Sequence, residues 1–163
     1  MIFSKAAEYA IRACIDMAVL EPGVYAMGKH IAERTGAPTP FLLKILQQLT
    51  RERILRSNKG PTGGFSLRVP PVDLTLRRVV AIVDGEDEEP RCIAGFPECN
   101  DSVPCPMHDS WKPLRGGIMD YLDNTTISAL AEAAAVKRRS DEKKKISKAG
   151  ARKKADSKKA DKG

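Results

Sequence analysis

Long hydrophobic runs are absent from this sequence of 163 residues. No apolar run approaches the roughly 18 residues that a membrane-spanning helix needs, and the first residues lack the pattern of a secretory signal peptide. No internal repeat is visible. We therefore expect a soluble, cytoplasmic chain of about one ordinary domain with a modest core.

Groups suited to acid–base catalysis are also scarce. The sequence has two histidines, His30 and His108, and shows neither a paired general acid and base nor a nucleophile beside a base. The Gly-rich stretch Lys59–Gly64 lacks the lysine after glycine and the following helix that a phosphate-binding P-loop needs. The sequence therefore favours a binding protein over an enzyme, and a small metalloenzyme is the class that it supports least.

Positive charge is concentrated at one end of the chain. The formal net charge is +7, but the last 27 residues, Lys137–Gly163, contain 13 Lys and Arg against 4 Asp and Glu. The preceding residues carry a net charge of −2. A segment with Ile146 as its only large apolar residue cannot offset the entropy of ordering, so we expect a disordered tail. Such a tail suits a polyanion such as nucleic acid, or acts as a solubilising segment.

A helix-turn-helix is predicted in the first third of the chain. Residues 1–20 have helical periodicity, with Ser4 as a plausible N-cap. A second helix, from about residue 27 to 35, precedes Gly36 at a C-terminal turn. Thr39 can cap the third helix and Pro40 suits its first position. Two helices joined by a tight turn with glycine make a helix-turn-helix candidate.

The third helix has two faces with different chemistry. Its apolar stripe comprises Leu42, Ile45, Leu46 and Leu49. Its polar stripe comprises Lys44, Gln47, Gln48 and Arg51. Glutamine can pair with adenine edges, and Arg and Lys bind guanine or phosphate, so this stripe is a candidate for reading DNA. The alternative is an ordinary solvated helix face.

The segment after this helix predicts a wing. Residues 53–57 and 65–69 resemble two short strands around a turn with three glycines. In the second strand, Phe65, Leu67 and Val69 alternate with Ser66 and Arg68, a pattern typical of a strand. Arg56, Lys59 and Arg68 would place positive charge on the wing, and its glycines would allow close approach to phosphates. A short helix follows over residues 75–84 and ends at Gly85.

Three of the four cysteines lie within 14 residues, with the spacing Cys92-x6-Cys99-x5-Cys105-x2-His108. Thiolates are soft ligands that suit iron–sulfur clusters or zinc. Structural zinc usually uses Cys pairs separated by two to four residues, so the uneven spacing favours a cluster. His108 could be a fourth ligand, a second-sphere donor or a helix cap. Cys14 lies within an apolar helical stripe and is expected to be a buried core thiol.

A further helix is predicted after His108, and Thr126 can cap a last short helix. The first of these carries an apolar stripe of Trp111, Leu114, Ile118, Tyr121 and Leu122. This stripe suits pairing with a partner helix or packing within one subunit. The chain divides into a winged helix-turn-helix domain (1–85), a cysteine-rich cluster-binding loop (86–108), a dimerisation helix with a final short helix (109–136) and the tail (137–163).

Taken together, these motifs resemble the Rrf2 family of bacterial transcription regulators, with its IscR-type and NsrR-type members. The resemblance covers about residues 1–135 and rests on Phe41–Leu49, on Lys59–Phe65 and on the cysteine set. It implies a mainly α, homodimeric winged helix-turn-helix protein that binds double-stranded DNA, as a repressor or dual regulator. The DNA-contacting residues would be Thr39, Lys44, Gln47, Gln48, Arg51, Arg56, Lys59, Gly60, Gly63 and Gly64.

The same resemblance implies an iron–sulfur cluster that senses cluster status, nitric oxide or redox state. In the IscR-type pattern, His108 would complete the ligands of a 2Fe–2S cluster, which we favour. In the NsrR-type pattern, Glu8 of the partner subunit would complete a 4Fe–4S cluster. One extra residue between the first two cysteines departs from the family pattern. Glu8 can equally pair with Arg12 on the surface of its helix, and the alternative function is a regulator whose cysteine loop binds zinc or acts as a thiol switch.

Overall fold

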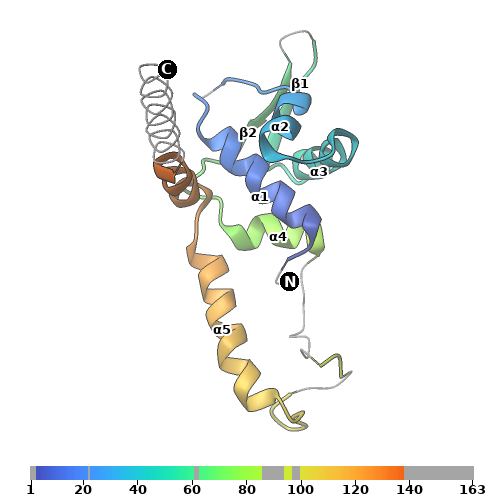
Figure 1. The fold of residues 1–163 in the computed structure, drawn as a ribbon, viewed down its shortest axis with the longest axis vertical. Helices are drawn as coiled ribbons and strands as arrows, with labels where there is room; N and C mark the ends of the chain where they lie inside the picture. The colour runs from blue at the N-terminus through green and yellow to red at the C-terminus, as the bar shows by residue number, and fades with distance from the viewer. Residues whose placement is uncertain (1–2, 22, 61–62, 86–93, 97–99, 138–163) are drawn as a thin grey trace, which may run out of the picture.

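The computed structural model describes residues 3–21, 23–60, 63–85, 94–96 and 100–137 (Figure 1). The fold is mainly helical with one small antiparallel sheet, as predicted. In chain order the elements are α1 (Lys5–Ala18), α2 (Gly28–Thr35), α3 (Thr39–Arg51), β1 (Leu55–Asn58), β2 (Gly64–Leu67), α4 (Leu76–Asp84) and α5 (His108–Asn124), followed by helical residues 127–137. None of the described helices is long and apolar enough to cross a membrane.

Helix α1 is the centre of the winged-helix unit. Ser4 caps it, as expected, because its hydroxyl accepts a hydrogen bond from Ala7 N at 3.1 Å. Its fully buried side chains are small, namely Ala7, Ala10, Ala13 and Cys14. Cys14 is therefore the core thiol that the sequence predicted, and burial raises its pKa to about 12.

The helix-turn-helix of α2 and α3 is formed as predicted, with one shift at its second helix. Gly36 ends α2 in the left-handed conformation, with φ of 71°. The N-cap of α3 is Pro38, so Thr39 is its first helical residue and makes no capping hydrogen bond. The predicted N-cap at Thr39 is therefore wrong by one residue. Pro38 is the last residue with an extended backbone, and Thr39 already has helical geometry. The apolar stripe of α3 is buried as predicted, at Leu42, Ile45, Leu46 and Leu49.

The wing pairs β1 with β2 in antiparallel register, with Leu55 opposite Leu67 and Asn58 opposite Gly64. The segment before α2 pairs with the other edge of β2, through two backbone hydrogen bonds of 2.8 and 2.9 Å between Ala26 and Phe65. Gly64 has φ of +150°, and a Cβ there would lie 2.2 Å from Ala26 O. Only glycine fits this position.

Burial along β2 differs from the predicted alternation. Ser66 is buried, whereas Phe65 and Leu67 are only half-buried. Helix α1 packs against β2, and Ser66 lies near Met17 and Leu20 at the end of that helix. The strand is thus covered on both faces, which an alternating pattern does not anticipate.

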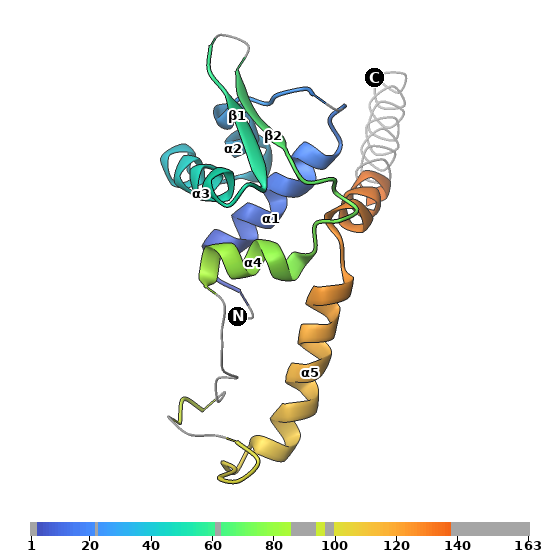
Figure 2. The ribbon, with the colours of Figure 1, turned by 180° about the vertical axis from the view of Figure 1, so that it is seen from behind.

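Helix α5 extends away from the winged-helix unit (Figures 1 and 2). Its end is attached to the start of α4, where Leu76 N donates to Thr125 O at 2.9 Å and Ile127 N donates to Leu74 O at 2.8 Å. The side chains of Leu74 and Ile127 are fully buried there. The start of α5, at His108, lies at the opposite end of the molecule from the wing.

An ion pair between a buried carboxylate and a partly exposed guanidinium joins α1 to α2. The Asp16 side chain is 4% exposed, and Arg34 donates to both of its carboxylate oxygens, from Nε at 2.8 Å and from Nη2 at 2.7 Å. Two parallel hydrogen bonds of this kind fix the geometry of both side chains. They set the position of α2, and therefore of the turn into α3, relative to α1.

We expect Arg34→Met to lower the free energy of unfolding by about 2 kcal/mol, because the buried Asp16 carboxylate loses its partner. Urea unfolding followed by circular dichroism measures this. The matched control is Arg12→Met, at a side chain that is 55% exposed, where we expect a change below about 0.5 kcal/mol. Adding Asp16→Leu to Arg34→Met should recover most of the loss. Equal stability of Arg34→Met and the parent would contradict this account.

Candidate nucleic-acid interface and cysteine segment

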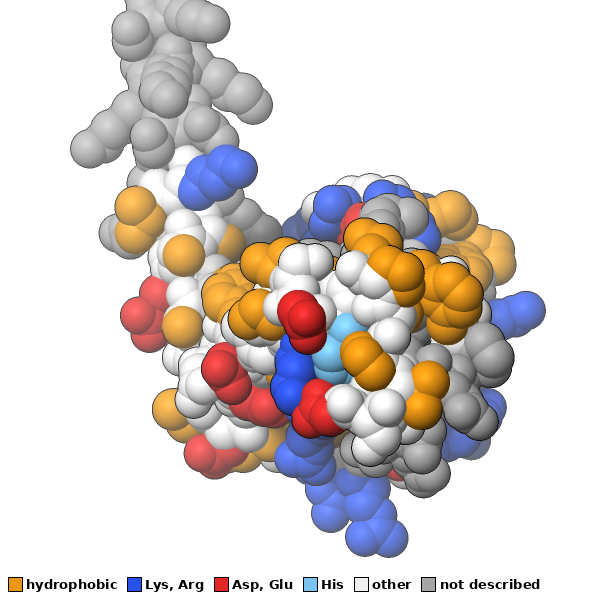
Figure 3. Space-filling model, turned by 90° about the horizontal axis from the view of Figure 1, so that it is seen from below, with side chains coloured by type: hydrophobic (Ala, Val, Ile, Leu, Met, Phe, Trp, Pro, Cys, Tyr) orange, Lys and Arg blue, Asp and Glu red, His pale blue; other side chains and the backbone are white. Residues whose placement is uncertain are grey.

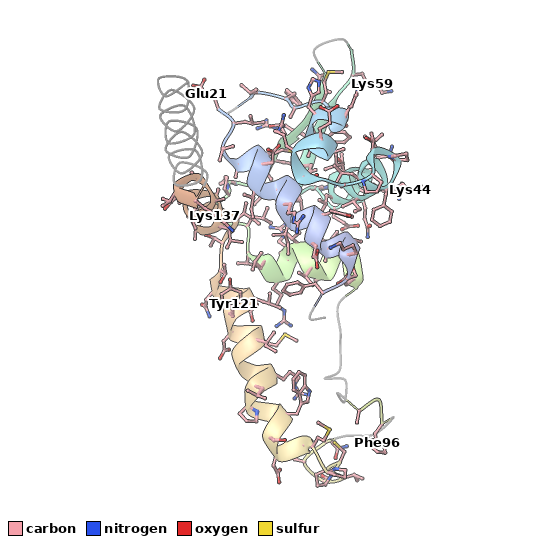
Figure 4. All side chains as sticks on the ribbon, viewed as in Figure 1. Glu21, Lys44, Lys59, Phe96, Tyr121 and Lys137 are labelled. Atoms are coloured by element: carbon pink, nitrogen blue, oxygen red, sulfur yellow. The ribbon has the colours of Figure 1, made fainter. Side chains whose placement is uncertain are left out.

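The outer face of α3 carries cationic and amide side chains that are open to solvent. Lys44, Gln47 and Arg51 are exposed, at the spacing that places them along one side of the helix. Lys44 projects from the outer side of α3 in Figure 4. The segment from Thr39 to Arg51 contains no acidic residue. This face therefore offers positive charge and hydrogen-bonding groups to a ligand approaching α3 from outside.

Gln48 departs from the expected stripe. Its side chain is half-buried, and Nε2 donates to the backbone oxygen of Ile82 in α4 at 2.6 Å. The prediction that Gln48 faces outward with its three neighbours is therefore corrected. Position 48 lies nearest the buried stripe of the helix, so its amide reaches α4 instead of solvent.

The wing adds further positive charge beside α3. Arg56, Lys59, Gly60 and Arg68 are all exposed, and Lys59 lies toward the tip of the wing in Figure 4. Gly60 has φ of +115°, and a Cβ at Gly63 would lie 2.3 Å from the Asn58 oxygen. These glycines allow a tight turn, in which Gly60 is exposed and Gly63 is buried. The wing residues 61 and 62 lie outside the described residues.

Thr39 occupies the first turn of α3, where its side chain is half-buried. The backbone N–H groups of a first helical turn have no partners within their helix. Thr39 thus lies at the N-terminus of α3 and is not part of its outer polar stripe.

The cysteine segment is described in part. Cys92 and Cys99 lie outside the described residues, whereas Cys105 and His108 are placed at the start of α5. His108 N donates to Cys105 O at 2.9 Å, so a single turn brings the two residues together. Met107 is the N-cap and His108 the first residue of α5, so the interpretation of His108 as a helix cap is wrong.

Asp101 holds the ring of His108. The His108 side chain is 8% exposed, and its Nε2 lies 2.9 Å from Asp101 Oδ1. Lys112 Nζ donates to the same carboxylate at 2.6 and 2.7 Å. The hydrogen bonds from Lys112 and then from His108 lower the pKa of Asp101. An ionised carboxylate only accepts hydrogen bonds, so Nε2 carries the proton in this contact. Figure 3 shows histidine between acidic and basic side chains at this end of the molecule.

The described part of the segment is compatible with a metal group but does not complete one. Among residues 94–96 and 100–137, as elsewhere in the described chain, no three His, Cys, Asp or Glu side chains gather as a metal site. The donor set fits in its chemistry, since a thiol and an imidazole lie one turn apart. The indole Nε1 of Trp111 is buried with no hydrogen-bond partner in the described structure. An N–H donor in that position, one turn after His108, suits an acceptor such as a sulfur atom.

Glu8 pairs with its own helix. Its carboxylate lies 2.6 Å from Lys5 Nζ and 3.9 Å from Arg12 Nη2. The hydrogen bond from Lys5 is the main cause that lowers its pKa. The interpretation of Glu8 as a surface partner of Arg12 is therefore confirmed, with Lys5 as the closer partner.

The apolar stripe of α5 is largely open to solvent. Leu114 is 63% exposed and Tyr121 is 56% exposed, whereas Leu122 is buried against the core. Trp111 and Ile118 are half-buried. One chain thus buries Leu122 at the α4 end of the stripe but leaves Leu114 and Tyr121 largely uncovered.

Sequence reasoning missed three contacts around these surfaces. They are Gln48 with Ile82, Ser4 with Asp84, and Asp101 with His108 and Lys112. The first two join residues far apart in the chain and left no local signal. The third had one, because Asn100 Oδ1 accepts from Ser102 N and Val103 N, a turn that an Asn-Asp-Ser sequence favours.

Comparisons with known proteins agree with this geometry. The Rrf2 family profile, described as an iron-dependent transcriptional regulator, matches residues 3–133. The chain is 32% identical over 135 residues to the Mycobacterium tuberculosis (strain H37Rv) protein Rv1287, whose name classes it with HTH-type transcriptional regulators. That match covers 82% of this chain and 83% of the relative.

Two further proteins extend the comparison. The HTH-type transcriptional regulator IscR of Vibrio vulnificus (strain YJ016) is 27% identical over 130 residues, covering 80% of this chain and 77% of its own. The crystal structure of the oxidized form of Staphylococcus aureus CymR superposes with a TM-score of 0.65 at 27% identity. It covers 81% of this chain and 97% of its own. The described winged-helix arrangement is thus shared with solved structures.

Proposed function

The chain belongs to the Rrf2 family of transcriptional regulators, and from that premise we propose that it is a homodimer whose affinity for operator DNA depends on an iron–sulfur cluster. The observation that carries the DNA-binding part is the outer face of α3, with Lys44, Gln47 and Arg51 exposed beside a cationic wing. A helix of this kind fits the major groove, where glutamine and arginine read base edges. Thr39 and the exposed wing residues Arg56, Lys59 and Gly60 would contact the DNA backbone or the minor groove. Gly63 is buried and Gly64 half-buried, so these two glycines would shape the turn of the wing.

The proposed cluster ligands are Cys92, Cys99 and Cys105, with His108 as the favoured fourth ligand and a 2Fe–2S group favoured over 4Fe–4S. The support within the described residues is the pair Cys105 and His108, one turn apart, with Asp101 on the second ring nitrogen. A histidine ligand commonly donates its other N–H to a carboxylate in this way. When bound, the cluster would supply a redox-active group whose oxidation or loss would change the affinity of the protein for operator DNA. Glu8 is the reserve fourth ligand. Its carboxylate is already paired with Lys5, which favours His108 over Glu8 for that role.

The proposed dimer contact is the exposed stripe of α5. Leu114 and Tyr121 leave apolar surface in water, and a second copy of the same helix would cover it. Two α3 helices would then be held at a fixed separation of about one turn of DNA, as a palindromic operator requires. The tail after Val136 would add affinity that does not depend on sequence, through its 13 cations. Residues 138–163 lie outside the described residues.

A thiol switch without a cluster is the second candidate function. The observation that favours it is the likeness to CymR, which has been solved in an oxidized form. In that case the cysteines would alternate between thiol and oxidised states. Alternatively, the same cysteines would bind zinc instead of an iron–sulfur cluster. Analysis of bound metal and sulfide distinguishes the thiol switch and the zinc site from an iron–sulfur cluster.

For the DNA-binding face, we expect Gln47→Ala to weaken binding to an operator duplex by about 1–3 kcal/mol and to relax its base preference, because a base contact is lost. The duplex is first selected by the parent protein from a random-sequence pool, and affinity is measured by fluorescence anisotropy. Arg115→Ala on α5 is the control and should bind as the parent does. If Gln47→Ala keeps the parent's affinity for selected and random duplexes, α3 does not read bases through this residue.

For the cluster, anaerobic purification should give a protein with visible charge-transfer absorption and with iron and sulfide in similar amounts. Cys105→Ala should lose both, because it removes a ligand. Cys14→Ala should keep both, because Cys14 is completely buried in the core. Comparing His108→Ala with Glu8→Ala identifies the fourth ligand. A colourless parent that contains stoichiometric zinc would replace the cluster with the second candidate function.

For the dimer, we expect Leu114→Lys to convert the protein to single chains in sedimentation velocity, because a charge in an apolar contact is costly to desolvate. Leu114→Met keeps volume and hydrophobicity and should remain dimeric. A parent that sediments as one chain at every concentration would place the dimer contact elsewhere or remove it.

A further inference from the structure

The side chain of Gln48 joins the helix proposed to read DNA to the end of another helix. Its Nε2 donates to Ile82 O at 2.6 Å, in a contact that is partly buried. Gln47 and Lys44, by contrast, are exposed on the outer side of the same helix. Gln48 is therefore placed to position α3 rather than to contact DNA.

Its acceptor lies in the last turn of α4. That helix ends at Asp84, and Gly85 follows with φ of +90°. The last four carbonyl groups of a helix have no N–H partner within it, and Ile82 O is one of them. The Gln48 amide thus binds a carbonyl group that is open because α4 stops where it does.

A second contact holds the same turn. Ser4 N donates to Asp84 Oδ2 at 2.9 Å, and the Ser4 hydroxyl donates to Oδ1. Because Ser4 also caps α1, the end of α4 is fixed between α1 on one side and α3 on the other. A shift or lengthening of this turn would change both contacts together.

The cysteine-rich segment starts at residue 86, four residues after Ile82. We propose that Gln48 is a positioning residue through which the state of the cysteine segment, acting on the last turn of α4, sets the position of α3. A hydrogen bond of 2.6 Å is lost within about 1 Å of displacement, which is the scale on which base contacts in a groove are made or broken. This inference rests on the proposed function for its consequence at DNA, but the contact itself involves neither DNA nor a metal.

The experiment uses the full-length protein with its cysteines either reduced or blocked with N-ethylmaleimide. Cys14 is protected by complete burial and by a pKa raised to about 12, and mass spectrometry verifies that it stays unmodified. Hydrogen–deuterium exchange of the α3 amides is compared between the two states for the parent, Gln48→Met and Gln47→Met. Methionine keeps the length of glutamine but cannot donate, and Gln47→Met is the same change one residue away.

In the parent and in Gln47→Met, blocking should change the exchange rates of the α3 amides severalfold. In Gln48→Met the two states should give the same rates, and Gln48→Lys, which restores a donor, should recover the response. If Gln48→Met does not fold, Gln48→Glu replaces it, because a carboxylate also lacks a donor. A response in Gln48→Met as large as in the parent would overturn the proposal, as would a parent whose α3 amides do not respond.

The same samples are then titrated with the selected operator duplex. We expect blocking to change the affinity of the parent by about 5-fold or more and to leave that of Gln48→Met unchanged. If α3 responds in the exchange experiment but no variant binds DNA, the proposed function fails while the coupling stands. If the parent's affinity responds to blocking and Gln48→Met responds equally, the coupling fails while the proposed function stands.

Discussion

Close approach to α1 is the constraint on which the rest of the winged-helix unit depends. The buried side of this helix carries alanines at positions 7, 10 and 13, with Cys14 and Met17 beside them. Such small side chains let α2, α3, α4 and β2 all pack against one helix. A larger side chain at any of the three alanines would separate these elements. The Asp16–Arg34 pair then fixes α2 within that packing, because two parallel hydrogen bonds tolerate little rotation.

Local patterns predicted the elements of this chain well. The periodicity of α3 identified its four buried leucine and isoleucine positions, and glycine identified the end of α2 and the turn of the wing. These features depend on residues within one turn of each other. The errors were of two kinds. The N-cap of α3 was misplaced by one residue, because either Pro38 or Thr39 could serve as the N-cap. The burial of Ser66 was missed, because an alternating pattern suggests that only one face of β2 is covered.

The site was harder to predict because its contacts join distant segments. The inward position of Gln48 depends on its contact with α4, which lies more than thirty residues further along the chain. The role of Asp101 depends on the turn that returns it to His108 and Lys112. Figure 4 shows the resulting separation, with Lys44 and Lys59 at one end and Phe96, within the cysteine segment, at the other.

The attachment of α5 gives that helix the mechanics of a lever. Its last turn is held at the start of α4 by the Leu76–Thr125 and Leu74–Ile127 hydrogen bonds, and its 17 residues extend about 25 Å from that fulcrum. A rotation of about 10° there would carry His108 through about 4 Å. A small rotation of α5 at its attachment to α4 would therefore produce a large displacement at its other end, next to the cysteine segment.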